Sequence, residues 1–207
     1  MLLNNLKNVI IISFLLTNFL NAYCNNIEIF KKSYDYEKMQ DYKDAIKVLV
    51  PLLNKNLSKD YKFLLYQRLG YLFFLNKNYN NSIEYYKKAM LINPESLSPY
   101  IGILKDYLYL GKYNKGIKIG NLILEKDLYN YYGNFYLGYC LYYNKNFKNS
   151  IQITKKILKL YPNDINFLEL YLKNMIATNN MKEARKTALK LITLNPTNII
   201  ANNFLNK

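Results

Sequence analysis

Few residues of this chain have types and spacings suited to chemistry. Histidine is absent, which excludes Ser-His-Asp and Cys-His catalysis and most histidine-ligated metal sites. The two cysteines, Cys24 and Cys140, are too few for a disulfide framework or a four-thiolate zinc site. The 14 acidic side chains are scattered, and neither a GxSxG motif nor a glycine-rich phosphate loop is present. We therefore expect no catalysis, no metal and no cofactor.

The chain is strongly basic, with a formal net charge of +15. Lysine supplies nearly all of the positive charge, because only Arg68 and Arg185 are arginines. Proteins that grip phosphates in bidentate fashion rely on arginine, and no block of five or six like charges occurs here. We interpret the charge as the drift of an A+T-rich coding sequence, with a specific polyanion-binding role as the alternative. No nucleic-acid partner is expected.

The first 24 residues have the pattern of an export signal. Lys7 precedes an apolar run over residues 9–20, whose roughly 12 residues fall short of the roughly 20 that span a bilayer. We expect cleavage after Ala22 or Cys24 and localisation in the periplasm or cell envelope. Two alternatives give membrane association through the N-terminus. The signal could remain uncleaved as an anchor, or Cys24 could carry a lipid, because residues 20–24 resemble a bacterial lipoprotein box in which Tyr23 is the departure.

Beyond residue 62 the chain repeats itself every 34 residues. Pro162 and Pro196 lie 34 residues apart, and Gly70 and Gly138 lie twice that distance apart. Each row holds two apolar stretches of helical periodicity joined by a short polar link, which predicts a pair of helices. The scarcity of glycine and proline, at 7 and 5 residues, also favours helices over tight-turned sheets. Recurring columns include apolar Leu69, Ile103, Leu137 and Tyr171, and small Ser82, Gly116, Ser150 and Ala184.

The rows resemble the tetratricopeptide repeat (TPR) family. The row that matches best reads Tyr66, Leu69, Gly70, Phe73, Tyr79, Ser82, Tyr86, Ala89 and Pro94. The next row departs most, with Leu104 where glycine is usual and Leu128 where proline is usual. A fainter copy precedes residue 63; about three residues are inserted near 56–60, and Pro51 is expected to kink its second helix.

The resemblance implies an all-α fold, an α-solenoid of about five helix-turn-helix repeats in a right-handed superhelix. The expected organisation is a signal peptide over residues 1–24 followed by one solenoid over 25–207. The predicted repeats cover residues 26–62, 63–96, 97–130, 131–164 and 165–198, and a capping helix covers 199–207.

The resemblance also implies a protein or peptide partner, bound on the concave face that the first helices build. The lysine and asparagine set that clamps acidic chaperone tails is missing, because Gln67, Tyr71, Ile101 and Lys105 stand at those positions. Carrying the family's exposed first-helix positions over gives six aromatic anchors and two flanking cations: Tyr71, Phe74, Tyr109, Phe135, Tyr139, Tyr142, Lys105 and Lys173.

The alternative for these aromatic columns is that they pack between repeats as core. We expect an exported protein-interaction adaptor that binds a peptide or a partner helix in this groove. The alternative is a membrane-tethered factor that helps to assemble an envelope complex. An enzyme, for example one that cleaves glycans, would need a carboxylate pair facing the aromatic groove, with Glu169 as one member.

Overall fold

The 34-residue rows fold into successive antiparallel helix pairs. The computed structural model describes residues 25–206, which are helical apart from short connections and contain no strand. The expectations for residues 1–24, including cleavage and a lipid on Cys24, lie outside the described residues. After a helix over residues 25–38, the elements are α2 (Tyr42–Leu49), η1 (Val50–Asn54), α3 (Lys59–Leu75), α4 (Tyr79–Ile92), α5 (Leu97–Tyr109), α6 (Tyr113–Lys126), α7 (Tyr131–Tyr143), α8 (Phe147–Leu160), α9 (Ile165–Ala177), α10 (Met181–Leu194) and α11 (Ile199–Leu205).

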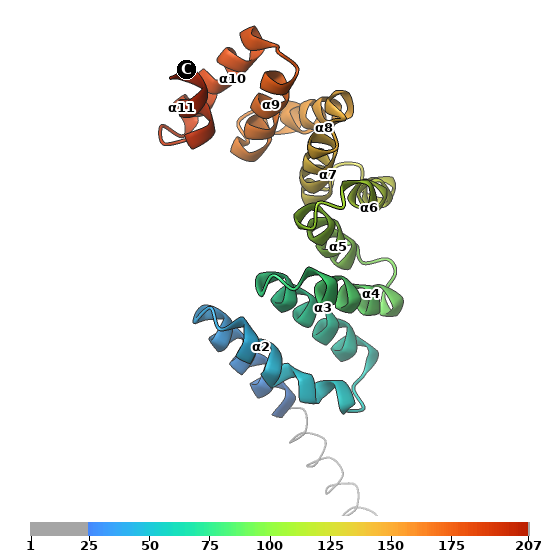
Figure 1. The fold of residues 1–207 in the computed structure, drawn as a ribbon. Helices are drawn as coiled ribbons and strands as arrows, with labels where there is room; N and C mark the ends of the chain where they lie inside the picture. Colours follow the sequence, from blue (N-terminus) through green and yellow to red (C-terminus); the bar gives the residue numbers. More distant parts are fainter. Residues whose placement is uncertain (1–24, 207) are drawn as a thin grey trace, which may run out of the picture.

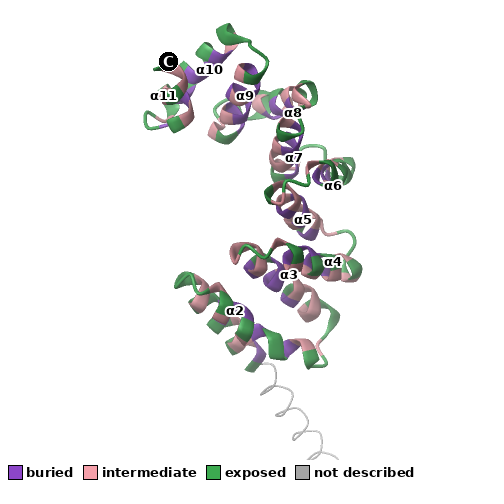
Figure 2. Cartoon of the chain, in the orientation of Figure 1, coloured by how far each residue is buried: buried purple, intermediate pink, exposed green. Residues whose placement is uncertain are grey.

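The helix pairs stack into an open crescent, so the fold is the expected all-α solenoid. Helices α3, α5, α7 and α9 line its inner side, α4 and α6 lie on its outer side, and α2 and α11 lie near its two ends (Figure 1). Buried residues follow the lines along which neighbouring helices meet, and exposed residues cover the connections and outer faces (Figure 2). At the C-terminal end, α11 packs against α9 and α10 and buries Ala201.

Each first helix ends in the same backbone geometry. The residue two places beyond the helix has a positive φ, where only glycine avoids a steric cost. In the link after α3, the Lys77 N–H donates to Phe74 O and the Asn78 N–H donates to Phe73 O, both at 2.9 Å, which forms a Schellman motif. The left-handed residues of the five links are Gln40 (60°), Lys77 (59°), Gly111 (68°), Lys145 (59°) and Asn179 (56°).

The first repeat differs from its prediction at the proline. Instead of a kinked helix, α2 ends at Leu49, and Pro51 lies in the first turn of the 3-10 segment η1. Proline has no N–H and its ring blocks the carbonyl one turn earlier, so the α-helix stops there. The inserted residues extend α3, which begins at Lys59 with Ser58 as N-cap, its Oγ accepting from the Tyr61 N–H at 3.3 Å.

Small residues in the second helices let the following first helix approach closely. A Cβ added to Gly116 of α6 would lie 2.6 Å from Cys140 Sγ on α7. Cys140 is fully buried, and burial raises the pKa of its thiol to about 12. The thiol is therefore a core group.

At two other repeat interfaces the same column holds a polar pair. Ser150 Oγ of α8 donates to Gly138 O at 2.9 Å and accepts a hydrogen bond from Asn174 Nδ2 of α9, also at 2.9 Å. Asn174 is fully buried and also donates to Leu170 O at 2.8 Å. The Ser150 hydroxyl thus donates its single hydrogen to the carbonyl of Gly138, and Asn174 is the donor in the hydrogen bond that the hydroxyl accepts.

The equivalent pair two repeats earlier contains an acid. Ser82 Oγ lies 2.8 Å from Gly70 O and 2.7 Å from Asp106 Oδ2. Asp106 is fully buried on α5, and its Oδ1 has no hydrogen-bond partner among the described residues. Burial raises the pKa of Asp106 to about 7, against the opposing effects of the Ser82 hydrogen bond and the charge of Lys105. When Asp106 is protonated, it donates to Ser82 as Asn174 donates to Ser150.

Candidate partner-binding groove

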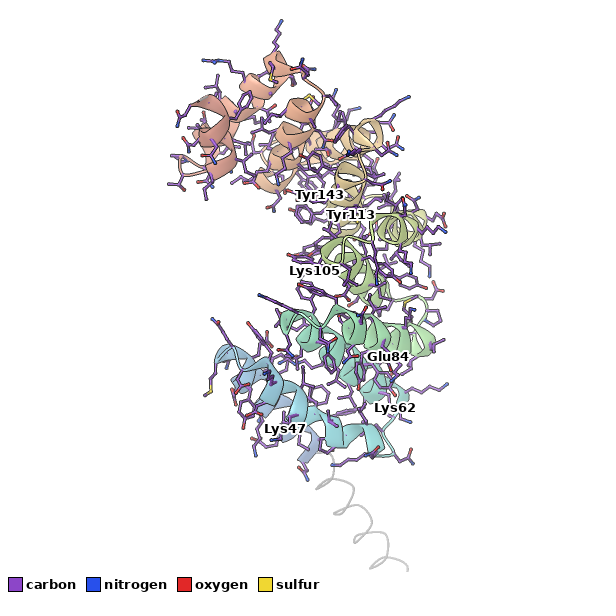
Figure 3. All side chains as sticks on the ribbon, viewed as in Figure 1. Lys47, Lys62, Glu84, Lys105, Tyr113 and Tyr143 are labelled. Atoms are coloured by element: carbon purple, nitrogen blue, oxygen red, sulfur yellow. The ribbon has the colours of Figure 1, made fainter. Side chains whose placement is uncertain are left out.

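A pocket lined mainly by aromatic rings lies between α5, α6 and α7. Its volume is about 490 Å³, and six of its seven lining residues are aromatic. Tyr113, Tyr143 and Lys105 all lie on the inner side of the crescent (Figure 3). We call this site the aromatic pocket and define it by Leu108, Tyr109, Tyr113, Phe135, Tyr136, Tyr139 and Tyr143.

Helical spacing along α7 brings these rings together. Phe135, Tyr139 and Tyr143 follow one another at intervals of four residues, which places them on one face of the helix. The Phe135 and Tyr139 ring centroids are 5.1 Å apart, edge to face, and Tyr143 stacks on Tyr113 of α6 at 5.4 Å. Tyr109 and Tyr143 remain 58% and 47% exposed. The less exposed rings of the pocket thus pack beneath Tyr109 and Tyr143, whose own rings remain in contact with solvent.

Burial affects the inner tyrosines of this pocket. It raises the pKa of the Tyr136 phenol to about 12 and also raises the pKa of the Tyr139 phenol. Both phenols are therefore neutral and can donate a hydrogen bond at physiological pH. The aromatic pocket offers apolar ring faces with polar edges, a surface suited to binding a side chain rather than to transferring protons.

A second aromatic group adjoins the pocket through Tyr109. The Phe74 ring packs edge to face on Tyr109 at 5.1 Å and lies 5.6 Å from Tyr79. Lys105 Nζ is 3.7 Å from the Phe74 ring centroid, within the range of a cation–π contact. Burial lowers the pKa of Lys105, and the nearby Asp106 opposes that shift.

Tyr71 lies in a separate pocket at the N-terminal end, with a volume of about 720 Å³, which we call the Arg68 pocket. The buried Arg68 is at its centre: Nη1 pairs with Glu37, while Nε donates to Ser33 Oγ at 3.1 Å. The Tyr34 ring centroid lies 3.7 Å from the guanidinium carbon of Arg68. These contacts join the helix over residues 25–38 to α3. Arg68 is therefore a packing and pairing residue, a role that its sequence position does not indicate.

The structure divides the predicted anchors into three groups. Tyr109, Phe135 and Tyr139 line the aromatic pocket, and Lys173 Nζ lies 5.1 Å from the Tyr139 ring centroid. Phe74 and Lys105 adjoin it through Tyr109, as described above. Tyr71 belongs to the Arg68 pocket, and Tyr142 packs on Phe147 with ring centroids 5.7 Å apart.

Sequence reasoning did not select three tyrosines that line the aromatic pocket. Tyr113 begins a second helix, whereas the family's groove positions lie on first helices. Tyr143 is one of the family's exposed first-helix positions but not one of the predicted anchors, and Tyr136 of the same helix is not one of those positions. The column of Tyr79, Tyr113 and Phe147, aromatic in three successive repeats, is the signal that could have identified Tyr113.

Comparisons with known proteins agree with this architecture. A family model described as "Tetratricopeptide repeat" matches residues 64–96, and one described as "Anaphase-promoting complex, cyclosome, subunit 3" matches residues 111–191. Among curated proteins, the uncharacterized protein ycf37 of Cyanophora paradoxa is 36% identical over 73 residues, 35% of this chain. The match spans 42% of that relative's length.

Solved structures give similarities of fold. A tetratricopeptide repeat protein from Parabacteroides merdae matches with a TM-score of 0.76 at 18% identity, and the match covers 86% of this chain and 70% of the Parabacteroides chain. MamA from Desulfovibrio magneticus RS-1 matches with a TM-score of 0.72 at 11% identity, covering 84% and 97%. YrrB, described as a TPR protein with an unusual peptide-binding site, matches with a TM-score of 0.68 at 12% identity, covering 86% and 91%. The 34-residue rows, the helix pairs that they form and the matching repeat model place this chain in the tetratricopeptide repeat family.

Proposed function

We propose that this chain is a protein-interaction adaptor whose aromatic pocket binds a segment of a partner protein. The observation that carries the proposal is the pocket itself, about 490 Å³ in volume, lined by six rings and located on the inner side of the solenoid. Tyrosine supplies a large contact area at low entropic cost and is frequent among residues that dominate binding energy. The peptide-binding site named for the similar fold of YrrB adds support.

We also infer that the chain acts by binding rather than by catalysis. None of the seven residues that line the aromatic pocket is acidic or a cysteine. Glu169, the carboxylate that a glycan-cleaving enzyme would have used, accepts a hydrogen bond from Asn198 Nδ2 at 2.6 Å. That contact ties the side chain to the N-cap of α11. The charge of Glu169 also raises the pKa of the Tyr139 phenol, so Glu169 is a single carboxylate beside a pocket whose seven lining residues include no acid.

A pair of tyrosine substitutions tests the proposal. Tyr109→Ala with Tyr143→Ala removes the two exposed rings of the aromatic pocket, while Tyr129→Ala with Tyr161→Ala removes two tyrosines of similar exposure outside it. Affinity purification from a native extract is expected to recover the same partner with the wild-type chain and the control. We expect that partner to be lost with the pocket variant, while all three proteins keep the same helical circular dichroism. Equal recovery by both double variants contradicts the proposal.

Export to the periplasm or cell envelope is a further part of the proposal, and residues 1–24 support it by their sequence pattern alone. Among the helices within residues 25–206, none is long and apolar enough to cross a membrane. N-terminal sequencing of the protein from its native cells is expected to find a chain that begins after Ala22 or Cys24. Membrane association that survives high salt would instead support the alternative, a tether through a lipid on Cys24 or an uncleaved signal.

A further inference from the structure

Two lysines flank the aromatic pocket without forming an ion pair among residues 25–206. Lys105 of α5 lies over Phe74, and Lys173 of α9 lies over Tyr139. Neither forms an ion pair with any carboxylate of residues 25–206. The acids nearest to them along the chain make hydrogen bonds to other groups: Asp106 faces Ser82 in the core, and Glu169, whose charge also raises the pKa of the Tyr139 phenol, accepts a hydrogen bond from Asn198.

Arg68, a buried cation of the N-terminal repeat, has an ion-pair partner, unlike Lys105 and Lys173. Arg68 is paired with Glu37 and hydrogen-bonded to Ser33, so its charge is compensated within the chain. Lys105 is half-buried as well, and removing an ammonium group from water is costly unless an anion compensates it. Lys105 and Lys173 therefore each place at the rim of the aromatic pocket an ammonium group that has no ion-pair partner among residues 25–206. An anionic partner is the complement of that rim.

The spacing of the helices sets the distance between the two charges along a bound chain. Helix α5 packs on α7, and α7 packs on α9. Neighbouring helix axes are about 8–10 Å apart, so α5 and α9 are separated by roughly 16–20 Å. An extended peptide advances about 3.3 Å per residue and covers this distance in about five or six residues. The aromatic pocket, formed largely by α7, lies between the two lysines.

We propose that the aromatic pocket binds an extended peptide segment that carries one large apolar side chain with an acidic residue about three positions to either side. The apolar side chain contacts the rings of Tyr109, Phe135 and Tyr139, and the two carboxylates pair with Lys105 and Lys173. This inference rests on the proposed function and adds the chemistry of the partner to it. The net charge of +15 adds long-range attraction for such a segment, whereas the two lysines determine where its acids bind.

Selection of peptides from a random display library on the purified full-length chain tests the proposal. We expect the bound peptides to be enriched in a large apolar residue bracketed by two acids that are five or six positions apart. The affinity of the most enriched peptide is then measured by fluorescence anisotropy. For Lys105→Glu with Lys173→Glu we expect binding about tenfold weaker, the effect of losing two partly exposed ion pairs.

Two controls separate the local contacts from net charge. Lys118→Glu with Lys182→Glu changes the net charge equally at exposed positions outside the aromatic pocket, and we expect a weakening of less than about twofold. A peptide with lysines in place of its two acids is expected to prefer the Lys105→Glu, Lys173→Glu variant over the wild type. This reversal requires a folded variant, so misfolding cannot imitate it.

Other results overturn the inference. Enriched peptides without the paired acids contradict it, as does equal weakening by the two double variants. If the peptides bind independently of Lys105 and Lys173 but are lost on Tyr109→Ala with Tyr143→Ala, the inference fails and the proposed function stands. A library that yields no peptide dependent on the pocket tyrosines contradicts both.

Discussion

The Asp106→Asn substitution is expected to stabilise this protein and to remove part of its pH dependence. Asp106 is fully buried, with one oxygen 2.7 Å from Ser82 Oγ and the other without a partner among the described residues. Asn174 occupies the equivalent position two repeats later and donates an N–H to Ser150. Asparagine at position 106 can make that donation at every pH, whereas aspartate can make it only while protonated.

The magnitude follows from the shifted pKa. Burial raises the pKa of Asp106 from 3.8 to about 7. Between these values the folded state holds a proton that the unfolded state has released, so the free energy of unfolding falls as the pH rises from about 4 to about 7. A shift of roughly three units at about 1.4 kcal/mol each corresponds to a loss of about 4 kcal/mol. Above about pH 8 this contribution to the pH dependence is flat, because Asp106 is then ionised in both states.

Urea unfolding followed by circular dichroism at pH 5 and pH 8 measures the effect. The difference between wild type and Asp106→Asn cancels the titration of all other groups, and we expect the advantage of the variant to grow by about 2–3 kcal/mol between the two pH values. Asn174→Asp is the reciprocal control, because it places a second buried acid against Ser150 and should add a pH-dependent loss. Parallel pH profiles for wild type and Asp106→Asn would refute the assignment of a protonated Asp106.

Three further predictions concern packing and backbone geometry. Lys77→Gly is expected to raise the free energy of unfolding by about 0.5–1 kcal/mol, because Lys77 has φ 59°. Gly111→Ala is expected to lower the free energy of unfolding by about 1 kcal/mol, because Gly111 has φ 68°. An unchanged urea midpoint for either variant would contradict the steric argument. Gly116→Ala is expected to cost about 1–3 kcal/mol because its Cβ would lie 2.6 Å from Cys140 Sγ, and Cys140→Ala in the same chain should restore part of the loss. With its thiol pKa near 12, Cys140 should resist alkylation at pH 8 until urea unfolds the chain; its rapid labelling in the folded protein, detected by peptide mass spectrometry, would be inconsistent with its burial.

Much of the fold could be predicted because a repeat places the same local signals at the same intervals. The spacing predicts a helix over residues 79–92, and α4 covers Tyr79–Ile92. Asparagine N-caps such as Asn78 and Asn146 reinforce these boundaries through side-chain hydrogen bonds to the backbone. The first repeat was harder to predict, because a proline can either kink a helix or end it. Here the α-helix ends before Pro51, and a 3-10 segment follows.

The groove was predictable only in part. Periodicity places Phe135 and Tyr139 on one face of α7, but contacts between repeats decide which rings face a pocket. Tyr142 packs on Phe147 of the following helix, whereas Tyr113 joins the pocket from a second helix. The burial of Asp106 depends likewise on Ser82 in the preceding repeat, a partner 24 residues away that no local pattern reveals.

Site-specific photo-crosslinking tests the central claim most directly. A benzophenone amino acid replaces Tyr143, an exposed ring of the aromatic pocket, or Tyr161, which has similar exposure outside that pocket. In native cells, we expect position 143 to crosslink to a discrete partner at a segment with an apolar residue, and position 161 to give no such product. Crosslinking of the same partner from position 161 but not from position 143 would contradict binding in the aromatic pocket.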